Sequence, residues 1–454
     1  MHGKDNMRHK TLSVLALLTL AGCATIRDAR KAQRQTGLEL PAGERTVTIA
    51  ELGLVDPSPL ELDRATAVAL TWHPAIMLAT QAVAAAEIAV HQAGVPLRPT
   101  LATTAGYSGK TTGAAANDWS FASDDALNLG LNFTWMIYDS GQTRASQRSA
   151  VADYIAATES FRATVVERVG AVRSAYFALA QAEALATVKA RSLEQYALLL
   201  RQAELKLKVG SGKKYDVTKA RVDGSNAELE LAVASNAVFT ARATLNNELG
   251  LAESVTFLLN PATTLNAPPG ALTDLIALAR TNQPALKVAQ AKVTAATATV
   301  DAAIAALYPT LSVNAAASYA ALAPRAASGS WGLSLLQNLF SGWNKQDAVK
   351  QRVVQLREAR AELARQEQQT VLALTTARAN LNSAQERQTT SDRLVAQAQE
   401  NLDLVLQQYA VGISSVLERS DAQLTFTQAA ANQIDARYGV ERSKAALFAI
   451  LGIL

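Results

Sequence analysis

Two long stretches of the chain carry the repeat of apolar and polar positions that is typical of helices packed along one side. No proline lies between Pro99 and Pro261, or after Pro324, and proline is the strongest breaker of a helix interior. We therefore expect long helices over residues 140–209 and 342–411, each about 105 Å long if unbroken. The i, i+3, i+4, i+7 spacing of a packing seam is shown by Leu402, Val405, Leu406 and Tyr409.

The segments before the long helices alternate between apolar and polar residues, which predicts β-strands. The clearest run is 126–138, and looser runs lie at 101–107, 311–319 and 331–339. Strands of roughly ten residues with one apolar face suit an outer-membrane barrel; for any one strand, a soluble sheet with one buried face is the alternative. Four strands in lipid would leave unpaired edges, and the smallest such barrels have about eight strands. We therefore expect at least two copies of the chain to close one barrel.

Internal similarity shows that the chain contains one plan twice. Residues 71–76 (TWHPAI) correspond to 281–286 (TNQPAL), and Leu249-Gly250 corresponds to Leu451-Gly452. Each copy reads as a helix, a β-hairpin, a long helix, a turn and a returning helix. Because the returning helices are about half as long as the long ones, we expect two short helices to stack end to end beside each long helix.

These patterns predict the organisation of the whole chain, with a fold class that is mainly α with a membrane β-barrel. A signal peptide (1–22) and a lipid-anchored tether (23–60) precede a first repeat (61–259), a connector (260–271) and a second repeat (272–454). The opening helices are expected over 61–95 and 272–307. The β-hairpins are expected at about 99–139 and 309–340, and the helical hairpins at about 140–250 and 342–452.

The first segment reads as an export signal whose cleavage site carries the only cysteine of the chain. Three basic residues precede an apolar run, Leu12 to Leu20, that is too short to span a bilayer, and Ala21-Gly22-Cys23 follows. This site resembles the lipobox of bacterial lipoproteins. The resemblance implies cleavage before Cys23, acylation of that residue and, since Ala rather than Asp follows it, sorting to the outer membrane. An ordinary signal peptide with a chance cysteine is the alternative.

The charge balance argues against a nucleic-acid partner. The formal net charge is +4, and residues 1–22 hold three basic residues and one acidic residue, so removal of this segment lowers the charge by 2 to +2. That charge is too small for a basic binding surface. No segment after residue 22 is expected to form a membrane-spanning helix, so strands would have to cross the membrane.

The duplicated hairpins, with a glycine at each helical turn, resemble the TolC family of outer-membrane efflux proteins over nearly the whole chain after the signal. At the second turn Tyr409 lies three residues before Gly412, and the acidic residues Glu418 and Asp421 lie six and nine residues after it. In the first copy Asp216 matches the Asp that, in the family, bonds across to the second helical hairpin. The resemblance implies a homotrimer whose twelve-stranded barrel continues into a periplasmic helical tube.

The resemblance also assigns a periplasmic gate to Tyr409, Glu418, Asp421 and Asp216. Glu418 and Asp421 are three residues apart and share a helix face, so three copies would form two rings of carboxylates that attract cations; an ordinary solvated face is the alternative. The family often carries an Arg at position 414, where this chain has Ser, so the salt bridge of that Arg is not predicted here. The tips expected to dock a periplasmic adaptor are Gly210, Ser211 and Gly212 on the first hairpin and Gly412, Ile413 and Ser414 on the second.

The sequence offers no enzyme site. The segment Gly210 to Lys214 (GSGKK) lacks the upstream glycine of a phosphate loop. After the signal only His73 and His91 remain as histidines, and no cysteine is left free for a metal. His73 precedes Pro74 near a helix start and reads as structural. No cofactor or metal is expected.

The leading prediction is therefore an outer-membrane exit duct of a tripartite efflux system, passive in itself. Its partners would be two further copies of the chain, a periplasmic adaptor, an inner-membrane pump and the outer-membrane lipid. The same channel in type I protein secretion is one alternative. A periplasmic adaptor lipoprotein is an alternative of a different class, and the two hairpins and the amphipathic strands argue against it.

Overall fold

The computed structural model describes residues 59–110, 124–251, 255, 257–260, 263–266, 270–320 and 326–453. These residues belong to one compact unit, Pro57–Leu454. The predicted signal peptide, nearly all of the tether, and Cys23 lie outside the described residues.

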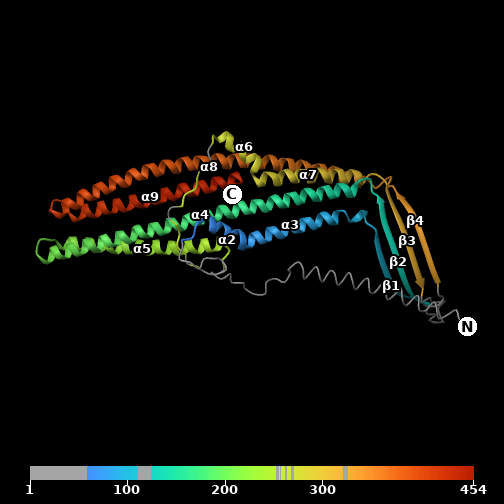
Figure 1. The fold of residues 1–454 in the computed structure, drawn as a ribbon, viewed down its shortest axis with the longest axis horizontal. Helices are drawn as coiled ribbons and strands as arrows, with labels where there is room; N and C mark the ends of the chain where they lie inside the picture. Colours follow the sequence, from blue (N-terminus) through green and yellow to red (C-terminus); the bar gives the residue numbers. More distant parts are fainter. Residues whose placement is uncertain are drawn as a thin grey trace. The chain divides into compact units, whose positions relative to one another are not determined.

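Two long helices form the frame of this unit, and shorter helices lie along them (Figure 1). The long helices, α4 (Gln142–Lys208) and α8 (Asn344–Ala410), contain 67 residues each, or about 100 Å at 1.5 Å per residue. Both predicted long helices are confirmed. The shorter helices are α2 (Leu62–Trp72), α3 (Pro74–Ala93), the 3₁₀ turn η1 (Val95–Leu97), α5 (Lys214–Glu248), α6 (Leu272–Asn282), α7 (Pro284–Ala305) and α9 (Val416–Leu451).

The opening helix of each repeat is broken, which corrects the prediction of continuous helices over 61–95 and 272–307. His73 and Gln283 adopt extended conformations, with ψ of 126° and 114°. Each stands directly before a proline, whose ring disfavours the helical conformation of the preceding residue. Proline is itself well accommodated at the first position of the next helix, so α3 and α7 begin at once.

The short helices meet end to end beside the long ones, as predicted. In Figure 1, α5 and α3 lie along the two halves of α4, and α9 and α7 along the two halves of α8. A Cβ on Gly250, which follows α5, would lie 2.8 Å from Cα of His73, which precedes α3; a Cβ on Gly452 would lie 2.8 Å from the carbonyl oxygen of Asn282. Both glycines have positive φ, +77° and +69°. Glycine is therefore needed at each junction for its conformation and its small size.

The strands form one antiparallel sheet in the order β1-β2-β3-β4. The hydroxyl of Ser140, which follows β2, donates to the carbonyl oxygen of Pro309 at 2.7 Å and so joins the two repeats at the helix end of the sheet. The predicted strands are confirmed, with bounds β1 (Thr100–Lys110), β2 (Asp124–Tyr138), β3 (Thr310–Ala320) and β4 (Ala326–Leu336).

The sheet has one apolar and one polar face. The pairing register places Phe133, Ala315 and Trp331 in one row across the strands, and Trp135, Val313 and Leu333 in the next row on the same face. Trp135, Trp331 and Leu333 are exposed, Trp331 to 86%, and the other three side chains are half-buried. The rows between them point to the other face and carry small or polar residues, among them Asn132, Thr134, Ser312, Asn314, Ser330 and Ser334.

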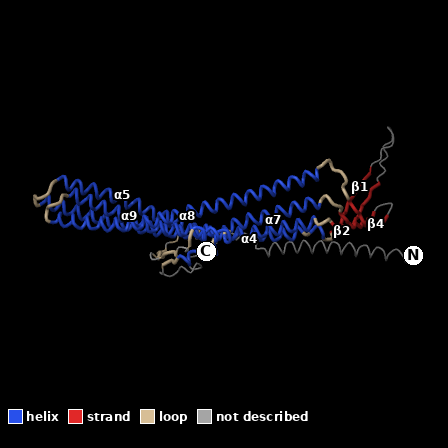
Figure 2. Tube along the Cα trace, turned by 90° about the horizontal axis from the view of Figure 1, so that it is seen from above, coloured by secondary structure: helices blue, strands red, loops and turns tan. Residues whose placement is uncertain are grey.

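The connector between the repeats packs against the middle of the long helices. The hydroxyl of Tyr176 on α4 donates to the carbonyl oxygen of Leu60 at 2.9 Å and accepts from the backbone N–H of Asn260 at 3.1 Å. Glu441 on α9 accepts from the backbone N–H of Leu265 at 2.7 Å. Figure 2 shows loop segments at mid-length on one side of the helical layer. The core between α6, α8 and α9 contains Leu275, Ala279, Leu374, Leu381, Val440, Leu447 and Leu451.

One described segment has the length and apolarity of a membrane-spanning helix, contrary to expectation. It covers Pro74–Leu97 with a mean hydropathy of 1.3, and 6% of its most apolar window is buried. Its many alanines raise the hydropathy without adding bulk that would need burial. Because α3 packs along α4 in the helical layer, length and composition are the only features it shares with a membrane span.

Candidate functional site at the hairpin tips

The turns that end the two helical hairpins have nearly the same backbone. Gly210 and Gly412, the second residues past the long helices, have φ of +79° and +80°. At the first turn a Cβ on Gly212 would lie 2.8 Å from the backbone nitrogen of Leu207, so the chain folds back closely on its own helix end. The glycine positions read from the sequence thus produce two tight tips.

The predicted tip residues are mostly exposed, and the two tips differ in chemistry. Gly210 and Ser211 are exposed beside the basic residues Lys208, Lys213 and Lys214. The second tip has no charged residue between its helices and presents apolar side chains instead: Val411 is 72% and Ile413 77% exposed. Ser414 turns back, and its hydroxyl donates to the side-chain oxygen of Gln408 at 2.8 Å.

Two of the predicted gate carboxylates cap their own helices. Glu418 accepts from the backbone N–H of Ser415 at 2.6 Å and from its hydroxyl at 3.0 Å. These hydrogen bonds from Ser415 hold the pKa of Glu418 below its usual value. Asp216 accepts from the backbone N–H of Lys213 at 3.4 Å. In the described structure both carboxylates thus stabilise helix starts, while Asp421 is exposed.

Tyr409 is the predicted gate residue that joins the two hairpins. Its ring is buried, with the ammonium of Lys206 from α4 3.9 Å from the ring centre and the guanidinium of Arg419 from α9 at 4.9 Å. Cations over an aromatic face are attracted by its quadrupole, by about 2 kcal/mol when desolvated. The Tyr409 hydroxyl has no hydrogen-bond partner within the described residues.

Arg419 is a buried cation that reaches from one hairpin to the other. It is 7% exposed, and its guanidinium donates to the side-chain oxygen of Gln202 on α4. No carboxylate of the described residues forms an ion pair with it. Burial therefore lowers the pKa of Arg419, and the Tyr409 ring and Gln202 compensate part of its desolvation.

A second contact between the hairpins is made by the next residue of α9. The hydroxyl of Ser420 donates to Oδ2 of Asp223 on α5 at 2.5 Å, and Lys219 pairs with the same carboxylate at 2.5 Å. Burial, together with the Asp223 charge, raises the pKa of the neighbouring Tyr196 to about 12. Further from the tip, Thr427 donates to Ser192 at 3.2 Å.

The sequence reasoning missed most of these contacts. We call the residues that join the hairpins near the tips the inter-hairpin cluster; they are Tyr196, Gln202, Lys206, Asp223, Tyr409, Arg419 and Ser420. One signal was available: Ser420, Gln423 and Thr427 are polar residues at the i, i+3, i+7 positions of a packing seam, and all three are buried.

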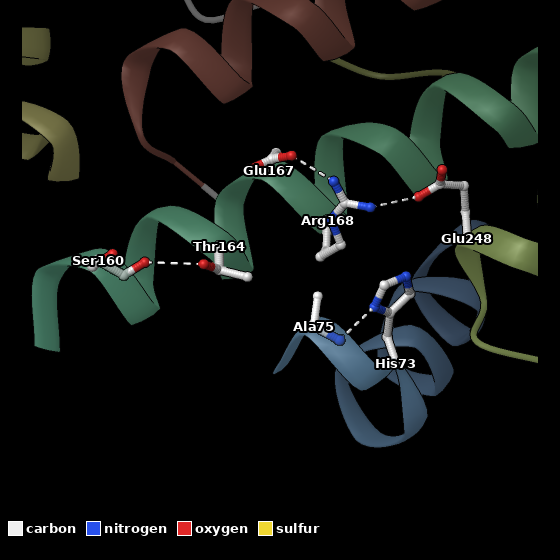
Figure 3. Close-up of polar contacts among 7 residues, drawn as sticks. All are labelled: His73, Ala75, Ser160, Thr164, Glu167, Arg168 and Glu248. Atoms are coloured by element: carbon white, nitrogen blue, oxygen red, sulfur yellow. Dashed lines mark hydrogen bonds and ion pairs between the residues drawn. The ribbon is translucent and has the colours of Figure 1, made fainter. Parts of the chain in front are cut away.

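A second polar group lies at mid-length, where α3 begins (Figure 3). Nδ1 of His73 accepts from the backbone N–H of Ala75 at 3.1 Å, which caps α3, and Arg168 pairs with Glu248 at 3.1 Å beside it. Burial, and then the charge of Arg168, lower the pKa of His73. Within the described ranges no three His, Cys, Asp or Glu side chains are grouped as a metal would need.

Comparison with known proteins places this fold in a family. The model of the outer membrane efflux protein family matches residues 67–251 and 275–453. The chain belongs to this family. The two matched ranges fall within the two predicted repeats, and the gap between them includes the predicted connector. Membership also places this efflux-family protein in the outer membrane.

Two curated relatives support the assignment. Outer membrane efflux protein BepC of Brucella suis is 26% identical over 300 residues, which cover 65% of this chain and 65% of BepC. Protein CyaE of Bordetella pertussis is 28% identical over 330 residues, which cover 68% of this chain and 65% of CyaE. The chain thus matches just under two thirds of the length of each relative.

Solved structures of lower identity show the same fold. CusC, described in connection with transmembrane channel formation, is 19% identical, with a TM-score of 0.77 over 89% of this chain and 96% of CusC. The CmeC outer membrane channel of Campylobacter jejuni is 16% identical, with a TM-score of 0.75 over 86% of this chain and 85% of CmeC. The fold is therefore that of outer-membrane channels, which are not enzymes. Family and fold together argue against the adaptor alternative.

Proposed function

We propose that this efflux-family protein is the exit duct of a tripartite efflux system and conducts its substrates passively across the outer membrane. The observation that carries the proposal is the two-faced sheet at one end of the long helices. Its apolar face, with Trp331, Leu333 and Leu335, suits contact with lipid, and its polar face suits a water-filled lumen.

The sheet needs further copies of the chain to close. Strands β1 and β4 each pair with one neighbour within the described residues, and an open edge in hydrocarbon costs several kcal/mol for each unpaired backbone group. Three copies would give the twelve-stranded barrel that the family resemblance implies. The helices that continue from the strands would then form the wall of a tube in the periplasm.

The tips of the helical hairpins are the proposed contact with the rest of the system. The tip residues, Gly210, Ser211 and Gly212 on one tip and Gly412 and Ile413 on the other, would meet a periplasmic adaptor coupled to an inner-membrane pump; all of them except Gly212 are exposed. Acylation of Cys23 would attach the chain to the outer-membrane lipid. Incorporation of labelled palmitate by the wild type, and its loss in Cys23→Ser, tests the anchor.

The gate is proposed to lie at the same tips. Tyr409 joins the hairpins, and Glu418 and Asp421 are exposed one turn apart on α9, where three copies would present carboxylates around the axis. Asp216 would help to hold the first tip in shape through its cap on α5.

Single-channel conductance of the purified protein in planar bilayers tests this function. We expect steady cation-selective openings that lose selectivity in the Glu418→Ala, Asp421→Ala double variant. Openings that keep their selectivity in this variant would retain the duct and refute the acidic constriction. No conductance from an oligomer of verified size would refute the duct itself.

A further inference from the structure

An open groove between α8 and α9 contains two arginine side chains without an acidic partner. The groove has a volume of about 740 Å³. Neither Arg387 of α8 nor Arg442 of α9 forms an ion pair within the described residues. Its small and polar lining includes Ala373, Ala377, Asn380, Ser383, Ser443 and Ala446.

A glycine on α9 leaves room for one of the two arginine side chains that line the groove. A Cβ on Gly439 would lie 3.9 Å from Nη2 of Arg387, so the Arg387 head lies over the bare backbone of α9. Arg442 follows Gly439 by three residues on the same face of α9, about one helical turn away. Two like charges without a counter-charge repel each other, and an anion between them would relieve that repulsion.

Arg442 also lines a groove of about 660 Å³ against α4 and α5, where Glu230 is paired with Lys189 at 2.8 Å. Two other acidic residues lie on the other side of Arg387. A second groove of about 510 Å³ adjoins the first toward the tips and contains Glu386 and Asp435. Asp435 accepts from the side chain of Gln181 at 2.6 Å. The first groove, lined by both arginines, contains no carboxylate. An anion would therefore be favoured in the groove on the barrel side of Arg387.

The groove lies away from the connector. On α9, Val440, Glu441 and Leu447 face α6 and the connector, and at 3.6 residues per turn Arg442 and Ala446 fall on the opposite side of the helix. Three connectors inside a tube would obstruct it. In the proposed trimeric duct, on which this step rests, the connectors therefore lie outside and the groove faces the lumen.

We propose that the α8–α9 groove binds the anionic group, a carboxylate or phosphate, of a solute that passes through the duct, between the guanidinium groups of Arg387 and Arg442. Planar guanidinium groups bind both kinds of anion through paired hydrogen bonds. Three copies would place six arginines at one level of the tube. This belt would favour anions between the barrel and the carboxylates proposed at the tips.

The test is block of single-channel current by inorganic pyrophosphate or by citrate, each added on the barrel side so that neither has to pass the tips. We expect either anion to reduce the wild-type current, and the half-blocking concentration to rise at least tenfold in the Arg387→Gln, Arg442→Gln double variant. Block by only one of the two anions would assign the groove to phosphate or to carboxylate groups.

Arg378→Gln is the matched control. Arg378 lies on the same helix nine residues before Arg387, or about two and a half turns, and so on the opposite side of α8. The Arg378→Gln substitution removes one positive charge from α8, as Arg387→Gln does. We expect this variant to be blocked like the wild type. Equal block of the wild type and the double variant, or loss of block in Arg378→Gln as well, would overturn the proposal.

Calorimetry separates failure of the groove from failure of the duct. If the wild type forms no channel, binding of pyrophosphate and citrate to the detergent-purified protein still decides the inference. Binding that the double variant loses and Arg378→Gln keeps would support the groove without the duct. Absence of binding, or equal binding by all three proteins, would overturn it.

Discussion

The hydrogen bond between Ser420 and Asp223 provides a quantitative test of how the hairpins are held together. Ser420 is buried, and its hydroxyl donates to Oδ2 of Asp223 at 2.5 Å. A hydrogen bond to a charged acceptor contributes about 1.5–3 kcal/mol. In Ser420→Ala the carboxylate keeps its ion pair with Lys219 and is not left isolated, so we take the lower end, about 1.5 kcal/mol. This free energy shifts the balance between joined and separated hairpins by about tenfold per copy.

The assay is the open probability of single channels in planar bilayers. We expect Ser420→Ala to raise it at least tenfold, and more if all three copies must separate together. Ser414→Ala is the control, because the Ser414 hydroxyl bonds only within its own hairpin, to Gln408. An open probability within twofold of the wild type, in a variant whose melting temperature is unchanged, would refute the role of this contact.

Three further predictions concern stability. Gly250→Ala should lower the melting temperature by several degrees, because its Cβ would meet His73 at 2.8 Å and its φ is positive, whereas Gly224→Ala, with open space around it, should not. The pKa of His73 is lower in the folded protein than in the unfolded chain, so the unfolded chain binds protons more readily. The melting temperature should therefore be highest above the ordinary pKa of about 6.5 and fall as the pH drops below it. His73→Ser should not show this fall. The pKa of Glu418 is also lowered, so its helix cap should stabilise the protein at a pH above its ordinary pKa and be lost in more acidic solution. In Glu418→Gln the melting temperature should differ less between neutral and acidic pH than in the wild type.

The sequence predicts the elements of this fold well because their signals are local. The proline-free windows and the apolar repeat determine α4 and α8, and strict alternation determines β2. The breaks before Pro74 and Pro284 were also local, but an otherwise continuous helical pattern masked them. The contact between Ser420 and Asp223 joins residues 197 positions apart, and no periodicity within either helix states which residues of two helices will meet.

The unbroken length of α4 and α8 has a mechanical consequence. Each runs without an interruption from the end of the strands to a hairpin tip, so it acts as a lever of about 100 Å. A tilt of about 3° at the sheet end would carry the tip through about 5 Å over that length. A displacement of this size exceeds the reach of any hydrogen bond. A small tilt of a long helix near the sheet is therefore sufficient to break the contacts between the hairpins at the tips. Conversely, a few side chains at the tips can restrain the tilt of both long helices.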